Sequence, residues 1–254
     1  MTFFEKIKNN IFIIILTTLL DVLFLFAFGY FTSSTRDNIG DISVQIGLRI
    51  TELLKQGTYI SLLDMLLSPG VQQLFFQLLF FLVILGLLTY LIYCIFQGSV
   101  WYLILSIFQK LKWVNYVKKF FLINLLWFLL FCTFYTLYVI AEMRTVIVEN
   151  ITGSSQFSLF SIVLYIFLFL IIYFALISYV TGKIKNTFKI GKKHWKKFVI
   201  MYLVLLGGFT VVNILLFFIH YISFELMMFA GIVLLPLFSL ARIYVIMVVK
   251  NVLQ

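Results

Sequence analysis

The sequence has little charge, proline and cysteine, and each shortage excludes a class of protein. Charged residues make up 11% of the 254 residues, against roughly a quarter in soluble globular domains, so a soluble fold is excluded. The two prolines leave long stretches uninterrupted. This favours membrane-spanning helices over a barrel, in whose strands apolar residues alternate. Cys94 and Cys132 lie within apolar runs, where a disulfide framework or a cysteine-based metal site has no support.

Sequence signals for an enzyme are also missing. There is no HExxH, no GxSxG and no Walker-type phosphate loop in the chain. The two histidines, His194 and His220, fall on opposite membrane faces in the topology that the charge pattern predicts, so they are not expected to share a metal. The sequence therefore predicts a protein without catalytic activity, cofactor or metal ion.

Apolar residues are abundant, at 64% of the chain with a mean hydropathy of +1.15. A helix needs about 20 of them to cross the roughly 30 Å hydrocarbon core of a bilayer. Six runs meet this requirement, at 11–32, 71–97, 120–141, 157–182, 198–221 and 224–249. They predict an all-α polytopic membrane helical bundle that forms one integral membrane domain over residues 1–254. The first run reads as a retained signal anchor, because it is long and no small-x-small cleavage site follows it.

The basic residues are distributed unevenly across the predicted membrane. Fifteen of the nineteen lysines and arginines share one side, and the segments on the other side carry more acidic than basic residues. Because basic loops stay in the cytoplasm, this predicts a multi-pass protein of the plasma membrane with both termini cytoplasmic.

The densest basic segment is expected to contact anionic lipid headgroups on the cytoplasmic face. Each basic residue near such a surface contributes on the order of 1 kcal/mol. The alternative is that this segment only fixes the topology. No nucleic-acid partner is expected, because the charge is confined to loops beside the membrane. The residues concerned are Lys183, Lys185, Lys189, Lys192, Lys193, Lys196 and Lys197.

The longest connection, residues 33–70 on the predicted outer side, contains apolar residues at helical spacing between charged ones. This pattern predicts an amphipathic segment over 39–67 that lies on the outer surface. It would cover the bundle, or alternatively act as a substrate lid or as a surface for a protein partner.

The two longer inner connections resemble each other. One runs from Gly98 to Phe120 and the other from Gly182 to Phe198, and in each a glycine ends a span and Lys-Lys-Phe opens the next. Three helical hairpins, each entered through a basic elbow, would give this pattern. With six helices and these elbows, the chain resembles uncharacterised prokaryotic membrane proteins of the YciC type and the membrane domain joined to some glycerophosphodiester phosphodiesterases. The resemblance implies a membrane-embedded helper and carries over no catalytic residue.

Asp21 is the most unusual residue, because it lies near the middle of the first apolar run. A charge there costs roughly 2.5 to 3.5 kcal/mol on insertion scales. At about 1.5 Å per residue, Asp21 lies about 18 Å and Arg242 of the last run about 12 Å from the inner edge. We therefore expect an intramembrane ion pair between the first and last spans. The alternative is that Arg242 snorkels to the inner interface.

Asn124, Gln77 and Asn213 also lie in or near apolar runs. We expect interhelical hydrogen bonds, which contribute about 0.6 kcal/mol each on average. A polar transport path is the alternative.

Two functions fit these features. The first is a non-catalytic structural or accessory membrane component that acts through lipid contacts and through a membrane-protein partner or a second copy of the chain. The second is a small transporter or permease subunit with Asp21 and Arg242 on the substrate or proton path. They differ in whether Asp21 faces a wet cavity or is buried against Arg242 or a helix backbone.

Overall fold

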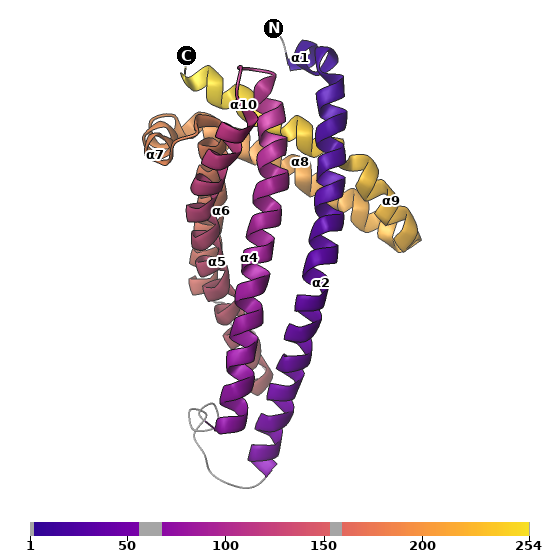
Figure 1. The fold of residues 1–254 in the computed structure, drawn as a ribbon, viewed down its shortest axis with the longest axis vertical. Coiled ribbons are helices and arrows are strands. Elements are labelled where there is room, and N and C mark those ends of the chain that lie inside the picture. Colours follow the sequence, from indigo (N-terminus) through magenta and orange to yellow (C-terminus); the bar gives the residue numbers. More distant parts are fainter. Residues whose placement is uncertain (1–2, 56–67, 153–158, 254) are drawn as a thin grey trace. The chain divides into compact units, whose positions relative to one another are not determined.

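The computed structural model describes residues 3–55, 68–152 and 159–253. It is 94% helical, and the described ranges contain no strand. Within these described ranges, six helical stretches are long and apolar enough to cross a membrane, so the chain is an all-α polytopic membrane protein. The helices in Figure 1 are α1 (Phe3–Asn9), α2 (Ile11–Lys55), α4 (Pro69–Ser106), α5 (Trp113–Thr152), α6 (Leu159–Thr181), α7 (Ile184–Lys193), α8 (Trp195–Ile222), α9 (Phe224–Leu234) and α10 (Pro236–Leu253).

The first three long helices extend well beyond the predicted spans. With 45 residues at about 1.5 Å each, α2 is roughly twice as long as a bilayer core is thick. No break separates the predicted span 11–32 from the predicted surface segment, whose described part, 39–55, is simply the second half of α2 (Figure 1). The rest of that segment, 56–67, lies outside the described residues.

The chain forms two compact units, Leu23–Tyr93 and the remainder, Met1–Val22 with Cys94–Gln254. We call them the hairpin unit and the main unit. The hairpin unit contains most of α2 and the first part of α4. In it the ring of Phe24 meets that of Tyr93 edge-on, with 6.3 Å between centroids. The second half of α2 carries an exposed ion pair, in which Arg49 Nη1 lies 3.1 Å from Glu52 Oε2.

The tightest core lies in the main unit, at the end where the lysines cluster. Tyr116, near the start of α5, donates from Oη to the carbonyl of Tyr179 near the end of α6, at 3.0 Å. Lys250 of α10 reaches Gln109, after α4, at 3.2 Å. The first contact joins α5 to α6, and the second joins α10 to the segment that follows α4. Fully buried side chains come from all of these helices and from α8, and include Ile104, Leu105, Phe120, Ile177, Phe198, Met201, Ile243 and Ile246.

The two inner connections differ in structure although their sequences are similar. Gly182 follows the last residue of α6 and has a φ of 66°, a left-handed conformation that favours glycine after a helix. Gly98 was predicted to end a span in the same way, but it lies inside α4. A Cβ there would meet Cδ1 of Phe120 at 3.1 Å. Gly98 thus lets the Phe120 ring pack closely against α4, whereas Gly182 ends a helix.

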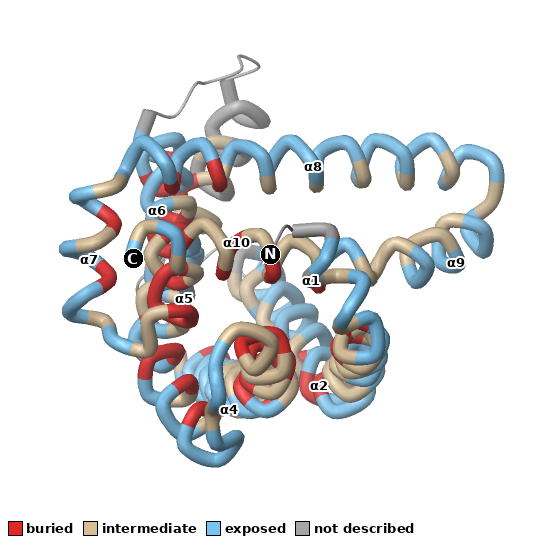
Figure 2. The backbone as a smooth tube through the Cα atoms, turned by 90° about the horizontal axis from the view of Figure 1, so that it is seen from above, coloured by how far each residue is buried: buried red, intermediate tan, exposed pale blue. Residues whose placement is uncertain are grey.

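The last part of the chain is a helical hairpin followed by a break. Ser223 separates α8 from α9 and caps α9 by accepting a hydrogen bond from the Leu226 amide at 3.2 Å. Helix α9 ends before Pro236, which has no amide hydrogen to continue the ladder and begins α10. Most of α8 and α9 is exposed (Figure 2), as expected for apolar helices that face lipid.

Candidate functional site

Asp21 and Arg242 form a buried ion pair in the main unit. Asp21 is only 5% exposed, and the Arg242 side chain is 13% exposed. Arg242 Nη1 donates to Asp21 Oδ2 at 2.7 Å, and Nη2 donates to Oδ1 at 3.0 Å. This two-pronged arrangement is the strongest geometry for a carboxylate and a guanidinium, and it joins α2 to α10.

Gln97 of α4 completes the site. Its Nε2 donates to Asp21 Oδ1 at 3.0 Å, and its Oε1 accepts from Arg242 Nη2 at 2.8 Å. Gln97 is 6% exposed. The three side chains thus form a closed ring of hydrogen bonds across three helices, which we call the polar clamp (Asp21, Gln97 and Arg242).

Sequence reasoning missed Gln97, because the predicted second span ended at this residue and placed its side chain at the interface. Helix α4 instead continues to Ser106, so Gln97 lies well inside the helix. The available signal was only a glutamine at the end of an apolar run.

A second contact joins α2 and α10 one turn away. Thr17 Oγ1 lies 2.8 Å from Ser239 Oγ, and Thr17 also donates to the Ile14 carbonyl at 2.9 Å. Both side chains are fully buried. The two hydroxyls thus add a second polar contact between α2 and α10, which together with the clamp we call the polar seam.

The geometry of the clamp is suited to holding helices together. The Asp21 carboxylate accepts three hydrogen bonds within the clamp. Breaking such a pair by removing one partner leaves an uncompensated charge, which is strongly destabilising.

A second, neutral network lies in the main unit between α4, α5 and α6. Tyr179 Oη donates to Asn124 Oδ1 at 2.6 Å, and Asn124 Nδ2 donates to Cys94 Sγ at 3.2 Å. Trp127 Nε1 donates to Ser178 Oγ at 2.8 Å. The interhelical hydrogen bonds predicted for Asn124 are therefore present.

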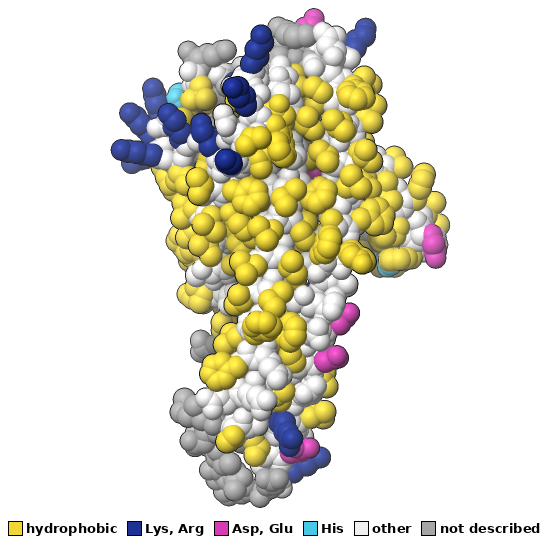
Figure 3. Space-filling view, viewed as in Figure 1, with side chains coloured by type: hydrophobic (Ala, Val, Ile, Leu, Met, Phe, Trp, Pro, Cys, Tyr) yellow, Lys and Arg dark blue, Asp and Glu magenta, His cyan; other side chains and the backbone are white. Residues whose placement is uncertain are grey.

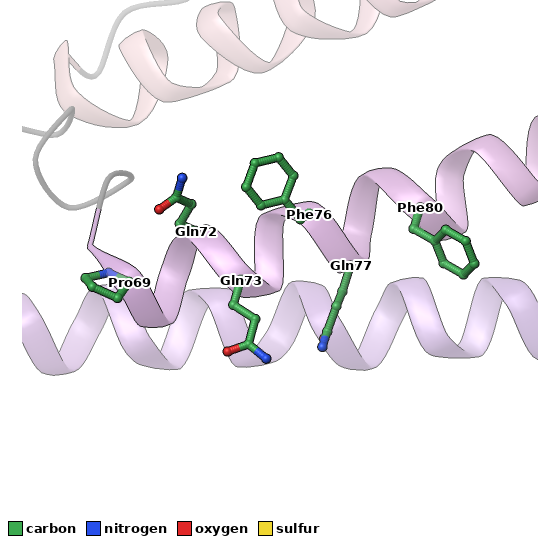
Figure 4. Close-up of a pocket in the computed structure, with 6 residues that line it drawn as sticks. All are labelled: Pro69, Gln72, Gln73, Phe76, Gln77 and Phe80. Atoms are coloured by element: carbon green, nitrogen blue, oxygen red, sulfur yellow. The ribbon is translucent and has the colours of Figure 1, made fainter.

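The other two predicted polar residues are not buried between helices. Asn213 is exposed on α8 and Gln77 is exposed on α4. Gln77 lines an open depression of about 560 Å³ along one face of α4, together with Gln72, Gln73 and Phe76. In Figure 4 the side chains of Gln73 and Gln77 point to one side of the helix, and those of Gln72 and Phe76 point to another.

All seven lysines of the predicted lipid contact are exposed, and four of them lie on α7. Helix α7 is amphipathic: Thr187 and Gly191 are buried, and its lysines face outward. Tyr173 Oη of α6 donates to the Gly191 carbonyl at 3.3 Å. A Cβ at Gly191 would meet Cε1 of Phe174 at 2.8 Å, so glycine lets α7 dock on α6.

Lys and Arg side chains gather around α7 beside a broad apolar surface (Figure 3). Trp113 and Trp195, the first residues of α5 and α8, are about half exposed, and Lys196 Nζ lies 5.9 Å from the Trp195 ring centroid. Exposed tryptophan next to lysine is typical of a membrane interface.

No group of three or more histidine, cysteine or acidic residues comes together in the described ranges. His194 precedes α8 and His220 lies near its far end, about 39 Å apart at about 1.5 Å per residue. The two histidines therefore cannot share a metal ion.

Comparisons with protein-family models, curated proteins and solved structures find no match to this chain. The resemblance to YciC-type proteins and to the phosphodiesterase-linked membrane domain stays a prediction from the sequence.

Proposed function

We propose that this protein is a non-catalytic structural or accessory component of the plasma membrane that acts through lipid and protein contacts. The polar clamp carries this proposal. A carboxylate on a substrate or proton path has to exchange with water, whereas Asp21 is 5% exposed and bonded to both of its clamp partners. We infer that the intramembrane charges hold α2, α4 and α10 together.

The lipid contact is assigned to the exposed lysines of α7 and the start of α8. Their number, their exposure and the exposed Trp195 beside Lys196 support an attachment to anionic headgroups. The orientation follows from the same lysines, which keep this end of the main unit in the cytoplasm.

Protein contacts are assigned to the second half of α2. A 45-residue helix exceeds the bilayer core of roughly 30 Å, so part of it lies outside the membrane. That part carries exposed Asp37, Asp41, Arg49 and Glu52. A charged, exposed helix of this kind suits a membrane-protein partner or a second copy of the chain.

Flux measurements test the accessory role against transport. The purified protein is reconstituted into liposomes, and proton entry is followed with an internal pH dye under an imposed pH gradient. We expect the same flux as in empty liposomes, for the wild type and for Asp21→Asn. Proton entry that the wild type supports and Asp21→Asn abolishes would replace this proposal with the transporter.

Cysteine labelling in intact cells tests the orientation. We expect Asp41→Cys on α2 to react with a membrane-impermeant maleimide from outside. Lys189→Cys on α7 should react only after the cells are permeabilised. Both side chains are exposed, so labelling in the reverse pattern would overturn the orientation.

A further inference from the structure

An apolar groove runs between α8 and α10, which are in contact in the main unit. Its volume is about 310 Å³, within the range of ligand sites in proteins. Val204, Gly208 and Val212 line it from α8, and Leu237, Ala241 and Tyr244 line it from α10. Every lining side chain except that of Tyr244 is apolar. The groove therefore suits an apolar occupant, with the Tyr244 side chain as the one polar group among its lining side chains.

The groove exists partly because residue 208 is glycine. A Cβ at Gly208 would meet no atom within 4 Å, so the space beside it is open. Gly207 also has open space around it but does not line the groove. The two adjacent glycines thus differ in one respect, namely whether a larger side chain would enter the groove.

Polar residues lie where the groove approaches the lysine-rich end. Lys197 is seven residues before Val204 on α8, and Asn251 is seven residues after Tyr244 on α10. Seven residues are two helical turns, or about 10 Å, so each residue lies on the same side of its helix as the groove. Both side chains are exposed. A cationic ammonium and an amide donor therefore lie toward the lysine-rich end of the apolar groove.

We propose that this groove binds one acyl chain of an anionic phospholipid, with the lipid phosphate at Lys197 and Asn251. The chain runs along α8 and α10 beside Gly208, and the glycerol region bridges the distance to the lysine. The groove gives the proposed lipid contact a specific location. The placement of the lipid phosphate at Lys197 rests on the proposed function, in which the exposed lysines contact anionic headgroups. Charge complementarity selects the anionic headgroup, since Lys196, Lys193 and Lys192 lie close to Lys197 in the chain.

Native mass spectrometry of the detergent-solubilised protein tests the site. The protein is titrated with phosphatidylglycerol and, separately, with phosphatidylcholine carrying the same acyl chains. Three variants accompany the wild type: Gly208→Leu fills the groove, Gly207→Leu is its matched control, and Lys197→Gln removes the cation. Both glycine changes replace the same residue type in the same helix, so a general effect on α8 would appear in both.

We expect the wild type to retain one phosphatidylglycerol molecule in preference to phosphatidylcholine. Gly208→Leu should lose the bound lipid, and Gly207→Leu should keep it. Lys197→Gln should bind phosphatidylglycerol about fivefold more weakly, the loss expected for one lysine near an anionic headgroup.

Four results would overturn the site. Equal lipid loss in Gly207→Leu and Gly208→Leu would show that the groove is not the binding place. A dimer that only Gly208→Leu dissociates would show that a second copy fills the groove. If Gly208→Leu keeps the phosphatidylglycerol preference, the groove proposal fails while the lysine contact stands. If the wild type shows no preference, both fail.

Discussion

The main unit contains two buried polar clusters that share helix α4 but differ in charge. Gln97 belongs to the polar clamp, and Cys94, one turn earlier, belongs to the neutral network with Asn124 and Tyr179. The clamp joins α2, α4 and α10 through an ion pair and an amide. The neutral network joins α4, α5 and α6 through a tyrosine, an amide and a thiol.

The difference shows that charged and neutral contacts between helices of one membrane protein differ in what their loss costs. Neutral hydrogen bonds between membrane helices contribute modestly, because the separated helices find other partners. A buried charge has no adequate alternative in hydrocarbon, so losing its partner costs far more. We therefore expect the association of α2 with α10 to depend on the few residues of the clamp. The α4, α5 and α6 group should depend on many small contributions, including packed aromatic rings such as Phe120 and Tyr179, whose centroids are 4.7 Å apart.

The largest effect should come from removing one charge of the clamp. Asp21→Asn leaves the guanidinium of Arg242 buried without a counter-charge, so we expect the free energy of unfolding to fall by about 3–5 kcal/mol. Unfolding in mixed micelles with increasing dodecyl sulfate measures this. The double variant Asp21→Asn with Arg242→Gln should be more stable than Asp21→Asn alone. Strictly additive losses would show that the pair is not coupled.

The next effect tests whether the clamp needs its amide. Gln97→Leu leaves the ion pair but removes one hydrogen bond from each charged partner, for an expected loss of about 1–3 kcal/mol. Gln77→Leu is the matched control, since it makes the same change on α4 at an exposed side chain. We expect Gln77→Leu to lie within about 0.5 kcal/mol of the wild type. Equal losses in the two variants would mean that Gln97 contributes nothing specific to the clamp.

The neutral network should respond less to a comparable change. Tyr179→Phe keeps the packed ring but removes the hydroxyl that donates to Asn124 at 2.6 Å, so we expect a loss of about 0.6 to 1.7 kcal/mol in the same assay. Tyr135→Phe on α5, where the tyrosine is half exposed, serves as the control. A loss as large as that of Asp21→Asn would remove the distinction between the charged and neutral clusters.

The smallest effect is expected one turn from the clamp. Thr17→Val is nearly isosteric and removes the hydroxyl contact to Ser239, for a loss of about 0.6 kcal/mol. Ser239→Ala should cost a similar amount, and the double variant should cost less than the two together. Additive losses from Thr17→Val and Ser239→Ala would show that the two hydroxyls act separately and do not extend the seam.

Part of this site could be found from the sequence, because charge in an apolar run is conspicuous. Asp21 and Arg242 differ little in predicted depth, which identified them as a pair. Gln97 could not be assigned, since a glutamine at the edge of an apolar run has no marked cost and its helix was predicted to end there. The partners of Asn124 were equally hidden, because Tyr179 and Cys94 have ordinary places in their own helices.

Two local features look different in the structure from what the sequence pattern suggested. The described part of the predicted amphipathic segment, 39–55, is helical but continues α2 without a break, and its position on the outer surface stays a prediction. The amphipathic helix of the main unit is α7, whose ten residues were predicted only as a basic elbow. Its amphipathic pattern covers a single short helix, and its docking on α6 depends on Gly191 fitting against Phe174.

The sequence by itself determined the all-α class and the number of apolar stretches long enough to span, because the bilayer sets the required length and apolar character of each stretch. It also singled out the charges that a membrane interior tolerates only at a cost. The tertiary structure decided which helices those charges join, that Gln97 closes the clamp, and that a groove opens beside Gly208 but not beside Gly207. These outcomes depend on the angle and spacing at which helices pack, which local patterns of apolar residues do not encode.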